Sequence, residues 1–236
     1  NVRKMEYCGV KTALDFTLRS ESWVRRMFSV TGVRTWKELQ GVSCIDIGEL
    51  PQKKSICTSR SFADRGLREI GKVEEAVANF ASSCSRKLKE QKSCCRAITV
   101  FVYTSRFNTS EPYHAINRTV TLPVATNDLR EIVSSAVAAL RSEWRGDGIY
   151  SYKKAGVIVW NICPDTAVQT DLFDPVDRGK QACLAAAIAA INRKNGYDTV
   201  KVAVQGTDKG WHLKHEHASR HYTTNIDDVI SVRTFR

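Results

Sequence analysis

Residues 96–104 read Arg-Ala-Ile-Thr-Val-Phe-Val-Tyr-Thr, a run of β-branched and aromatic residues that alternates with a period of two. The run predicts a strand. Similar runs recur nearby. Some of them are separated by stretches with an apolar side chain every three or four residues, and such stretches predict amphipathic helices. In chain order, the sequence predicts strand 55–62, helix 69–91, strand 96–104, strand 116–122, helix 127–145 and strand 153–160. A β-α-β-β-α-β order is typical of a split βαβ or ferredoxin-like sandwich, with two helices on one face of a sheet that contains antiparallel strands.

One face of this sheet is predicted to stay open. If the helices cover the side that carries Ile98, Val100 and Val102, the alternation places the intervening side chains on the opposite side. The side chains expected on this open face are those of Thr99, Phe101, Tyr103, Asn117, Thr119 and Thr121. A polar and aromatic face of this kind suits a ligand.

A small helical region is predicted before the sandwich, over residues 1–50. Thr12 is a candidate helix N-cap after Gly9. Residues 22–40 carry a helical apolar pattern with a break near Gly32. This region is expected to be a unit separate from the sandwich, which spans residues 53–162.

Residues 163–236 follow the sandwich as a C-terminal extension. An Ala-rich helix is predicted at 176–194 and a short strand at 199–205, so the extension has α/β character. The whole chain is therefore predicted to be α+β, with a helical region, a βαββαβ sandwich and an α/β extension.

The charge of the chain favours a polyanionic partner. Lys and Arg number 36 and Asp and Glu 25, which gives a formal net charge of +11. The basic residues gather at 53–73 and 86–106, where they would release counterions from nucleic acid; the alternative is an ordinary solvated basic surface. The longest uncharged apolar run, residues 182–191, has about half the length that a membrane span needs, so no membrane partner is expected. The eight cysteines show no Cys-x-x-Cys pair and are predicted to be reduced, mostly buried cytosolic thiols.

Chemical motifs are sparse. The sequence contains no phosphate-binding Gly-rich loop, no His-Glu-x-x-His and no Gly-x-Ser-x-Gly. Four histidines fall in His212-x-x-His215-x-His217-x-x-x-His221. They would need one fixed geometry to hold a metal, and the basic residues among them favour the alternative of a polar tail, so no metal site is assigned.

Six short motifs occur in an order and with intervals that resemble a known family. They are Gly9-Val-Lys-Thr-Ala-Leu-Asp15, Cys57-Thr-Ser-Arg-Ser-Phe62, Thr104-Ser-Arg-Phe107 with Glu111-Pro-Tyr113, Tyr152-Lys-Lys-Ala-Gly-Val157, Gln169-Thr-Asp-Leu-Phe-Asp174 and Arg220-His-Tyr-Thr-Thr224. Together they resemble the C-terminal part of a Y-family translesion DNA polymerase of the UmuC type, the catalytic subunit of bacterial DNA polymerase V. The resemblance covers essentially the whole chain.

The resemblance implies a division of labour along the chain. Residues 1–50 would be a thumb remnant, 53–162 the little-finger domain that binds DNA, and 163–236 the C-terminal extension. The palm carboxylates that bind magnesium in this family would precede Asn1, which agrees with a chain that lacks an initiator Met and is expected to be a fragment. No catalytic residue, metal or cofactor is therefore assigned here, although the parent polymerase would need magnesium. The implied setting is the bacterial cytoplasm, at the nucleoid, in the SOS response to DNA damage.

The resemblance also implies a set of DNA contacts to a primer-template duplex. Thumb backbone near a helix N-terminus and the little-finger sheet along the major groove would meet phosphates without reading bases. The residues implicated are Gly9, Lys11, Thr12, Ser59, Arg60, Ser61, Arg96, Thr99, Asn117, Thr119, Lys153 and Lys154. The alternative for each basic residue is a solvated charge, and for Ser59 to Ser61 a plain edge strand.

A second implied role is partner binding. Gln169, Leu172 and Phe173 match a bacterial sliding-clamp motif that resembles Gln-Leu-x-Leu-Phe, with Thr170 in place of the first Leu. The alternative is that Leu172 and Phe173 belong to a satellite core, although a loop with two prolines favours exposure. A regulatory subunit resembling UmuD′ is the other expected partner. A non-catalytic Y-family adaptor that recruits the clamp and other proteins remains the alternative function.

Overall fold

The structure is a computed structural model that describes residues 1–45, 48, 53–63, 66–196, 198–207, 210–211 and 218–232. The chain forms two compact units, Asn1–Gln52 and Lys53–Arg236. Within the described residues, no helix is both long enough and apolar enough to cross a membrane.

The first unit is helical, as predicted. It contains α1 (Val2–Tyr7), α2 (Ala13–Thr17) and α3 (Glu21–Glu38). Its core joins Val10, Phe16, Val24 and Val33. The break predicted near Gly32 lies at Ser29, where φ is 59° and ψ is −162°. Gly32 instead permits close packing, because a Cβ there would lie 2.3 Å from the Cβ of Phe28.

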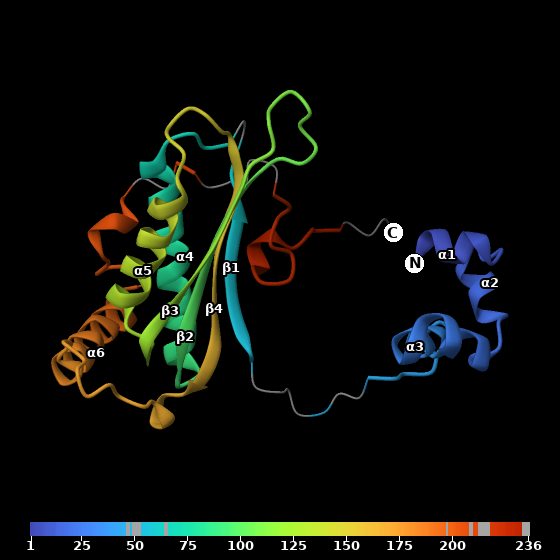
Figure 1. The fold of residues 1–236 in the computed structure, drawn as a ribbon, viewed down its shortest axis with the longest axis horizontal. Coiled ribbons are helices and arrows are strands. Elements are labelled where there is room, and N and C mark those ends of the chain that lie inside the picture. Colours follow the sequence, from blue (N-terminus) through green and yellow to red (C-terminus); the bar gives the residue numbers. More distant parts are fainter. Residues whose placement is uncertain are drawn as a thin grey trace. The chain divides into compact units, whose positions relative to one another are not determined.

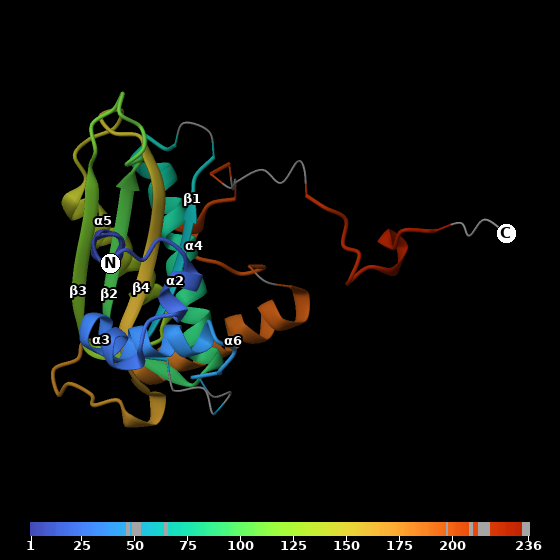
Figure 2. The same cartoon turned by 90° about the vertical axis from the view of Figure 1, so that its right-hand side faces the viewer.

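The second unit contains the predicted sandwich. Its elements are β1 (Ser55–Ser61), α4 (Ile70–Glu90), β2 (Ser93–Thr104), β3 (Ala115–Thr126), α5 (Leu129–Glu143) and β4 (Tyr152–Pro164). The strands form one antiparallel sheet in the order β1-β4-β2-β3. Figure 2 shows the four strands side by side, with β1 at one edge and β3 at the other. Helices α4 and α5 cover one face of this sheet (Figure 1), so the predicted α+β class is confirmed.

The core of this unit lies between the sheet and these two helices. Ile98, Val100 and Val102 are fully buried on the strand side, and Phe80 and Leu140 are buried on the helix side. Glu74 on α4 is also buried, and its carboxylate accepts hydrogen bonds of 2.6 and 2.8 Å from Arg141 on α5. This bidentate pair joins the two helices where the charge of Glu74 would otherwise be buried alone.

In its described residues, the C-terminal extension contains α6 (Arg178–Asn195) and three short 3₁₀ turns, Asp165–Ala167, Ala203–Gln205 and Ile226–Asp228. The helix predicted at 176–194 is confirmed. The strand predicted at 199–205 is wrong, because side chains satisfy its backbone amides in place of a neighbouring strand. Asn192 Oδ1 accepts from the Val200 N–H at 2.8 Å, and Gln205 Oε1 accepts from the Val202 N–H at 3.1 Å.

The extension is attached to the sandwich through α4. Gln205 is 1% exposed, and its backbone carbonyl accepts a hydrogen bond from Asn79 Nδ2 at 2.9 Å. Trp211 is 4% exposed and belongs to the same core cluster as the sheet. Its ring meets Phe62 and Phe80 edge to face, with centroid separations of 6.4 and 5.3 Å. Part of the extension therefore completes the core of the sandwich.

The prediction that the eight cysteines are mostly buried is wrong, because the structure buries three of them, Cys84, Cys94 and Cys95. The difference in exposure predicts their reactivity. Burial raises the pKa of Cys94 to about 11 and that of Cys95 to about 12, whereas Cys57 and Cys183 are exposed. Because the thiolate is the reactive form, we expect a maleimide at neutral pH to label Cys57 and Cys183 well before Cys94 and Cys95. Peptide mapping by mass spectrometry, in native buffer and in urea, measures the order. Equal native rates for Cys57 and Cys95 would contradict this burial.

Candidate nucleic-acid interface and partner motif

The open face of the sheet is built in rows that cross all four strands. One row joins Asn117, Phe101, Gly156 and Ser59, and the next joins Thr119, Thr99, Ile158 and Cys57. The flanking rows are Thr121, Ala97, Trp160 and Ser55 on one side and Ala115, Tyr103, Lys154 and Ser61 on the other. All six side chains predicted for the open face therefore share it.

At the centre of this face, the ring of Phe101 packs over Gly156. A Cβ on Gly156 would lie 2.4 Å from Phe101 Cζ and 2.5 Å from Ser59 Cβ, so Phe101 lies directly over the glycine. Phe101 also stacks on Tyr103 with 5.2 Å between ring centroids. These contacts leave Phe101 only 8% exposed although no α4 or α5 side chain covers this face.

Hydroxyl groups continue the face beside the aromatic pair. Thr99 Oγ1 and Thr119 Oγ1 are 2.8 Å apart, and Trp160 Nε1 donates to Thr99 Oγ1 at 3.0 Å. The Trp160 side chain itself is 42% exposed. The surface is thus polar and aromatic, and Lys154 is the one charged residue in its four rows.

The two edges of the sheet direct backbone amides outward. The Phe62 N–H donates to the Lys153 carbonyl at 2.8 Å, which fixes the alternation of bonds between β1 and β4. In an antiparallel pair, every second residue points its N–H away from the partner strand. Ser59 and Ser61 are these residues on β1, so their N–H groups point out of the sheet.

The opposite edge repeats this arrangement. The Thr104 N–H donates to the His114 carbonyl at 3.0 Å, so Asn117 and Thr119 direct their N–H groups away from β2. Four of the predicted residues therefore combine an outward amide with a side chain on the open face. Three strand spacings of about 4.8 Å separate the two edges, roughly 14 Å in all, which is close to the ~12 Å width of the DNA major groove.

Three basic residues of the predicted set lie elsewhere. Arg60 is exposed but alternates with Ser59 and Ser61, so it lies on the helix side of β1. Arg96 sits at a register shift in β2, and its Nη2 donates to the Pro123 carbonyl at 3.4 Å. Lys153 sits at a register shift in β4, with its Nζ 3.5 Å from the Phe62 carbonyl. Sheet alternation therefore brings together Ser59, Ser61, Thr99, Asn117, Thr119 and Lys154 but not these three.

In the first unit, the predicted phosphate contacts form a turn before α2. Gly9 adopts a φ of 68°, and its N–H donates to the Glu6 carbonyl at 3.0 Å. Asp15 Oδ2 accepts from the N–H groups of Lys11 and Thr12, at 3.0 and 2.9 Å. These bonds lower the pKa of Asp15, with the Lys11 bond the largest cause. The two amides are thus already bound by a carboxylate.

The clamp-type motif lies in the loop between β4 and α6. Gln169 is exposed, and the side chains of Leu172 and Phe173 are 91% and 86% exposed. The loop folds on itself, because Asp171 Oδ1 accepts from the Phe173 N–H at 3.1 Å. The satellite-core alternative for Leu172 and Phe173 therefore does not hold.

A metal site finds no support in the described part of the chain. No group of three or more His, Cys, Asp or Glu side chains is placed there to hold an ion. His212, His215 and His217 lie outside the described residues. The fourth histidine of this sequence run, His221, donates its backbone N–H to Asp228 Oδ2 at 3.0 Å.

Two protein-family models match successive parts of the second unit. The model of the impB/mucB/samB family C-terminal domain matches residues 53–172. A second model, described as a domain of unknown function (DUF4113), matches residues 182–232.

Full-length relatives show the same likeness. Protein UmuC of Salmonella typhimurium is 36% identical over 98% of this chain and 54% of its own length. Protein ImpB of Salmonella typhimurium is 35% identical over 98% of this chain and 54% of its own length. Protein MucB of Escherichia coli is 36% identical over 92% and 51%. The chain thus spans about half the length of the curated relatives it matches. It therefore belongs to the impB/mucB/samB family and corresponds to the C-terminal part of a UmuC-type protein.

Proposed function

We propose that this chain is the DNA-binding and partner-binding C-terminal part of an error-prone translesion DNA polymerase that acts in the bacterial response to DNA damage. The observation that carries the proposal is the open sheet face, which is flanked at both edges by outward amides of Ser59, Ser61, Asn117 and Thr119. Backbone amides bind phosphates of any sequence, as a polymerase that moves along its template requires. Lys154 adds a cation at the β1–β4 side of the same face.

Catalysis is no part of the role proposed for this chain. The parent polymerase would bind magnesium and nucleotide through its palm, and no residue described here is assigned to that chemistry. A non-catalytic adaptor is the second candidate, and the exposed Leu172 and Phe173 favour it to the extent that they offer a partner site. A sliding clamp fits this site, and a UmuD-like regulatory subunit is a further proposed partner. Both candidates act at the nucleoid in the cytoplasm.

Proline substitution tests the contribution of the outward amides to DNA binding separately from that of the serine hydroxyls. Ser59→Pro with Ser61→Pro removes two N–H groups that the sheet does not use, and an edge strand tolerates proline at such positions. Amide bonds to a charged phosphate contribute about 1.5–3 kcal/mol each, so we expect affinity for a primer-template duplex to fall at least tenfold. Fluorescence anisotropy with the whole chain, on duplexes of two unrelated sequences, measures the loss.

The controls test whether amides or charges are responsible. Ser59→Ala with Ser61→Ala keeps both amides and should bind almost as the unchanged chain does. Lys154→Ala should reduce the slope of log affinity against log salt by about 0.9 if it meets one phosphate, whereas the proline pair should leave that slope unchanged. Unchanged affinity of the proline pair, with circular dichroism showing an intact fold, would refute this interface.

A further inference from the structure

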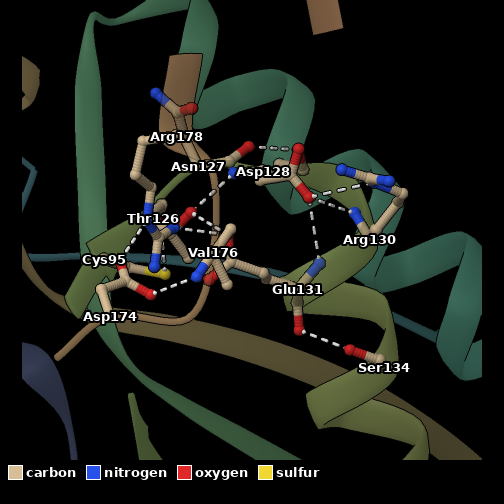
Figure 3. Close-up of polar contacts among 11 residues, drawn as sticks. Cys95, Thr126, Asn127, Asp128, Arg130, Glu131, Ser134, Asp174, Val176 and Arg178 are labelled. Carbon is tan, nitrogen blue, oxygen red and sulfur yellow. Dashed lines mark hydrogen bonds and ion pairs between the residues drawn. The ribbon is translucent and has the colours of Figure 1, made fainter. Parts of the chain in front are cut away.

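The loop that carries Leu172 and Phe173 is held by hydrogen bonds at its far end. The Asp174 N–H donates to the Asp171 carbonyl at 3.2 Å, and the Val176 N–H donates to Asp174 Oδ1 at 3.1 Å. Asp174 thus closes the turn on one side with its backbone and on the other with its carboxylate. Figure 3 shows this carboxylate beside Val176 and Arg178.

Arg178 connects this turn to the sandwich. Its Nε donates to Asp174 Oδ2 at 2.6 Å, and its Nη1 donates to Glu131 Oε1 at 2.5 Å (Figure 3). The hydrogen bond from Arg178 is the largest cause that lowers the pKa of Asp174. The side chains of Arg178, Glu131 and Asp174 are 30%, 22% and 11% exposed, so water screens this bridge less than a surface pair.

The far end of the bridge is itself fixed. Glu131 lies in the first turn of α5, and its N–H donates to Asp128 Oδ1, the cap of that helix, at 3.2 Å. Its Oε1 also accepts from Thr126 Oγ1, at the end of β3, at 3.3 Å. Arg178 therefore ties the loop to a helix that packs on the sheet and not to another loop.

We infer that Arg178 is a positioning residue, which holds the loop so that Leu172 and Phe173 project into solvent before a partner binds. The inference rests on the proposed clamp-binding role of these two side chains. A loop that is already ordered loses less conformational entropy on binding than a free peptide does. The guanidinium suits this task because its rigid planar fork fixes the direction of its bonds to the two carboxylates, whereas the donors of an ammonium group rotate freely.

Titration of a bacterial sliding clamp with the whole chain tests the inference. We expect Arg178→Ala to weaken binding about three- to tenfold, toward the affinity of a synthetic peptide of residues 168–175, which lacks the bridge. Arg178→Lys should recover part of the loss. Arg130→Ala is the matched control, because Arg130 lies in the same first turn of α5 but pairs with Asp128 and not with the loop.

A double-mutant cycle separates positioning from loss of structure. Glu131→Gln should weaken clamp binding by a similar factor, because both changes break the Arg178–Glu131 contact that ties the loop to α5. Adding Arg178→Ala to Glu131→Gln should cost little more, since the Arg178–Asp174 contact that it also removes does not reach α5. Melting temperatures of all variants should stay near that of the unchanged chain. If the clamp fails to bind the unchanged chain, the proposed clamp role is wrong. If it binds, and Leu172→Ala with Phe173→Ala abolishes binding while Arg178→Ala does not weaken it, the clamp role stands and the positioning role is wrong.

Discussion

Trp211→Ala is expected to destabilise the unit Lys53–Arg236 by about 3–5 kcal/mol, a large share of the 5–15 kcal/mol that stabilises a typical domain. Trp211 is 4% exposed and fills a site between Phe62 and Phe80. Its Nε1 also donates to Glu75 Oε1 at 3.2 Å, and this bond is lost with the ring. Hydrogen exchange of the β2 amides measures the free energy of opening of this unit, because β2 lies in it and not in the unit Asn1–Gln52.

Trp160→Ala is the matched control, because it deletes the same ring at a site that is 42% exposed. Trp160 gives up one hydrogen bond, to Thr99, and little packing, so its expected cost is about 1 kcal/mol or less. Exchange rates that rise equally in the two variants would show that Trp211 does not complete the core. The larger effect at Trp211 would mean that the sandwich depends on a side chain beyond residue 205, well past the last strand.

Periodicity predicted the regular elements well because their burial follows a simple rule. The helix predicted at 69–91 occurs at Ile70–Glu90, since its apolar residues recur on one face that packs on the sheet. The strand predicted at 199–205 failed because Asn192 and Gln205 supply the backbone partners from their side chains. Such bonds depend on tertiary position, which periodicity does not report. Trp211 gave no periodic signal either, since it is a single large apolar residue in an irregular segment.

Residues that are adjacent in a sequence motif can lie on opposite faces of the sheet at the candidate interface. Ser59, Arg60 and Ser61 form one block in the sequence, but a strand places the arginine on the opposite face from the two serines. Strand alternation alone predicts that separation. The register shifts at Arg96 and Lys153 could not be predicted in this way, because each inserts an irregularity that the apolar pattern tolerates. The outward amides follow only once strand order and register are known.

Leu172→Ala with Phe173→Ala is expected to weaken binding of a bacterial sliding clamp by more than about 2 kcal/mol, or roughly thirtyfold. The two side chains are 91% and 86% exposed on a loop that Arg178 anchors, so removing them takes nothing from the described core. An exposed Leu-Phe pair is the kind of apolar anchor that fills a pocket on a partner, while Gln169 would add a smaller polar contact. Isothermal titration of the clamp with the whole chain measures the change.

Tyr222→Ala with Ile226→Ala is the matched control, because it removes another aromatic and aliphatic pair, 45% and 88% exposed, from the C-terminal tail. This control should bind the clamp as the unchanged chain does, and both double variants should keep the melting temperature. A clamp affinity that falls equally in the two variants would indicate nonspecific apolar association. An affinity that falls in neither would remove the clamp from the partners of this loop, and Leu172 and Phe173 would then need a different partner to account for their exposure.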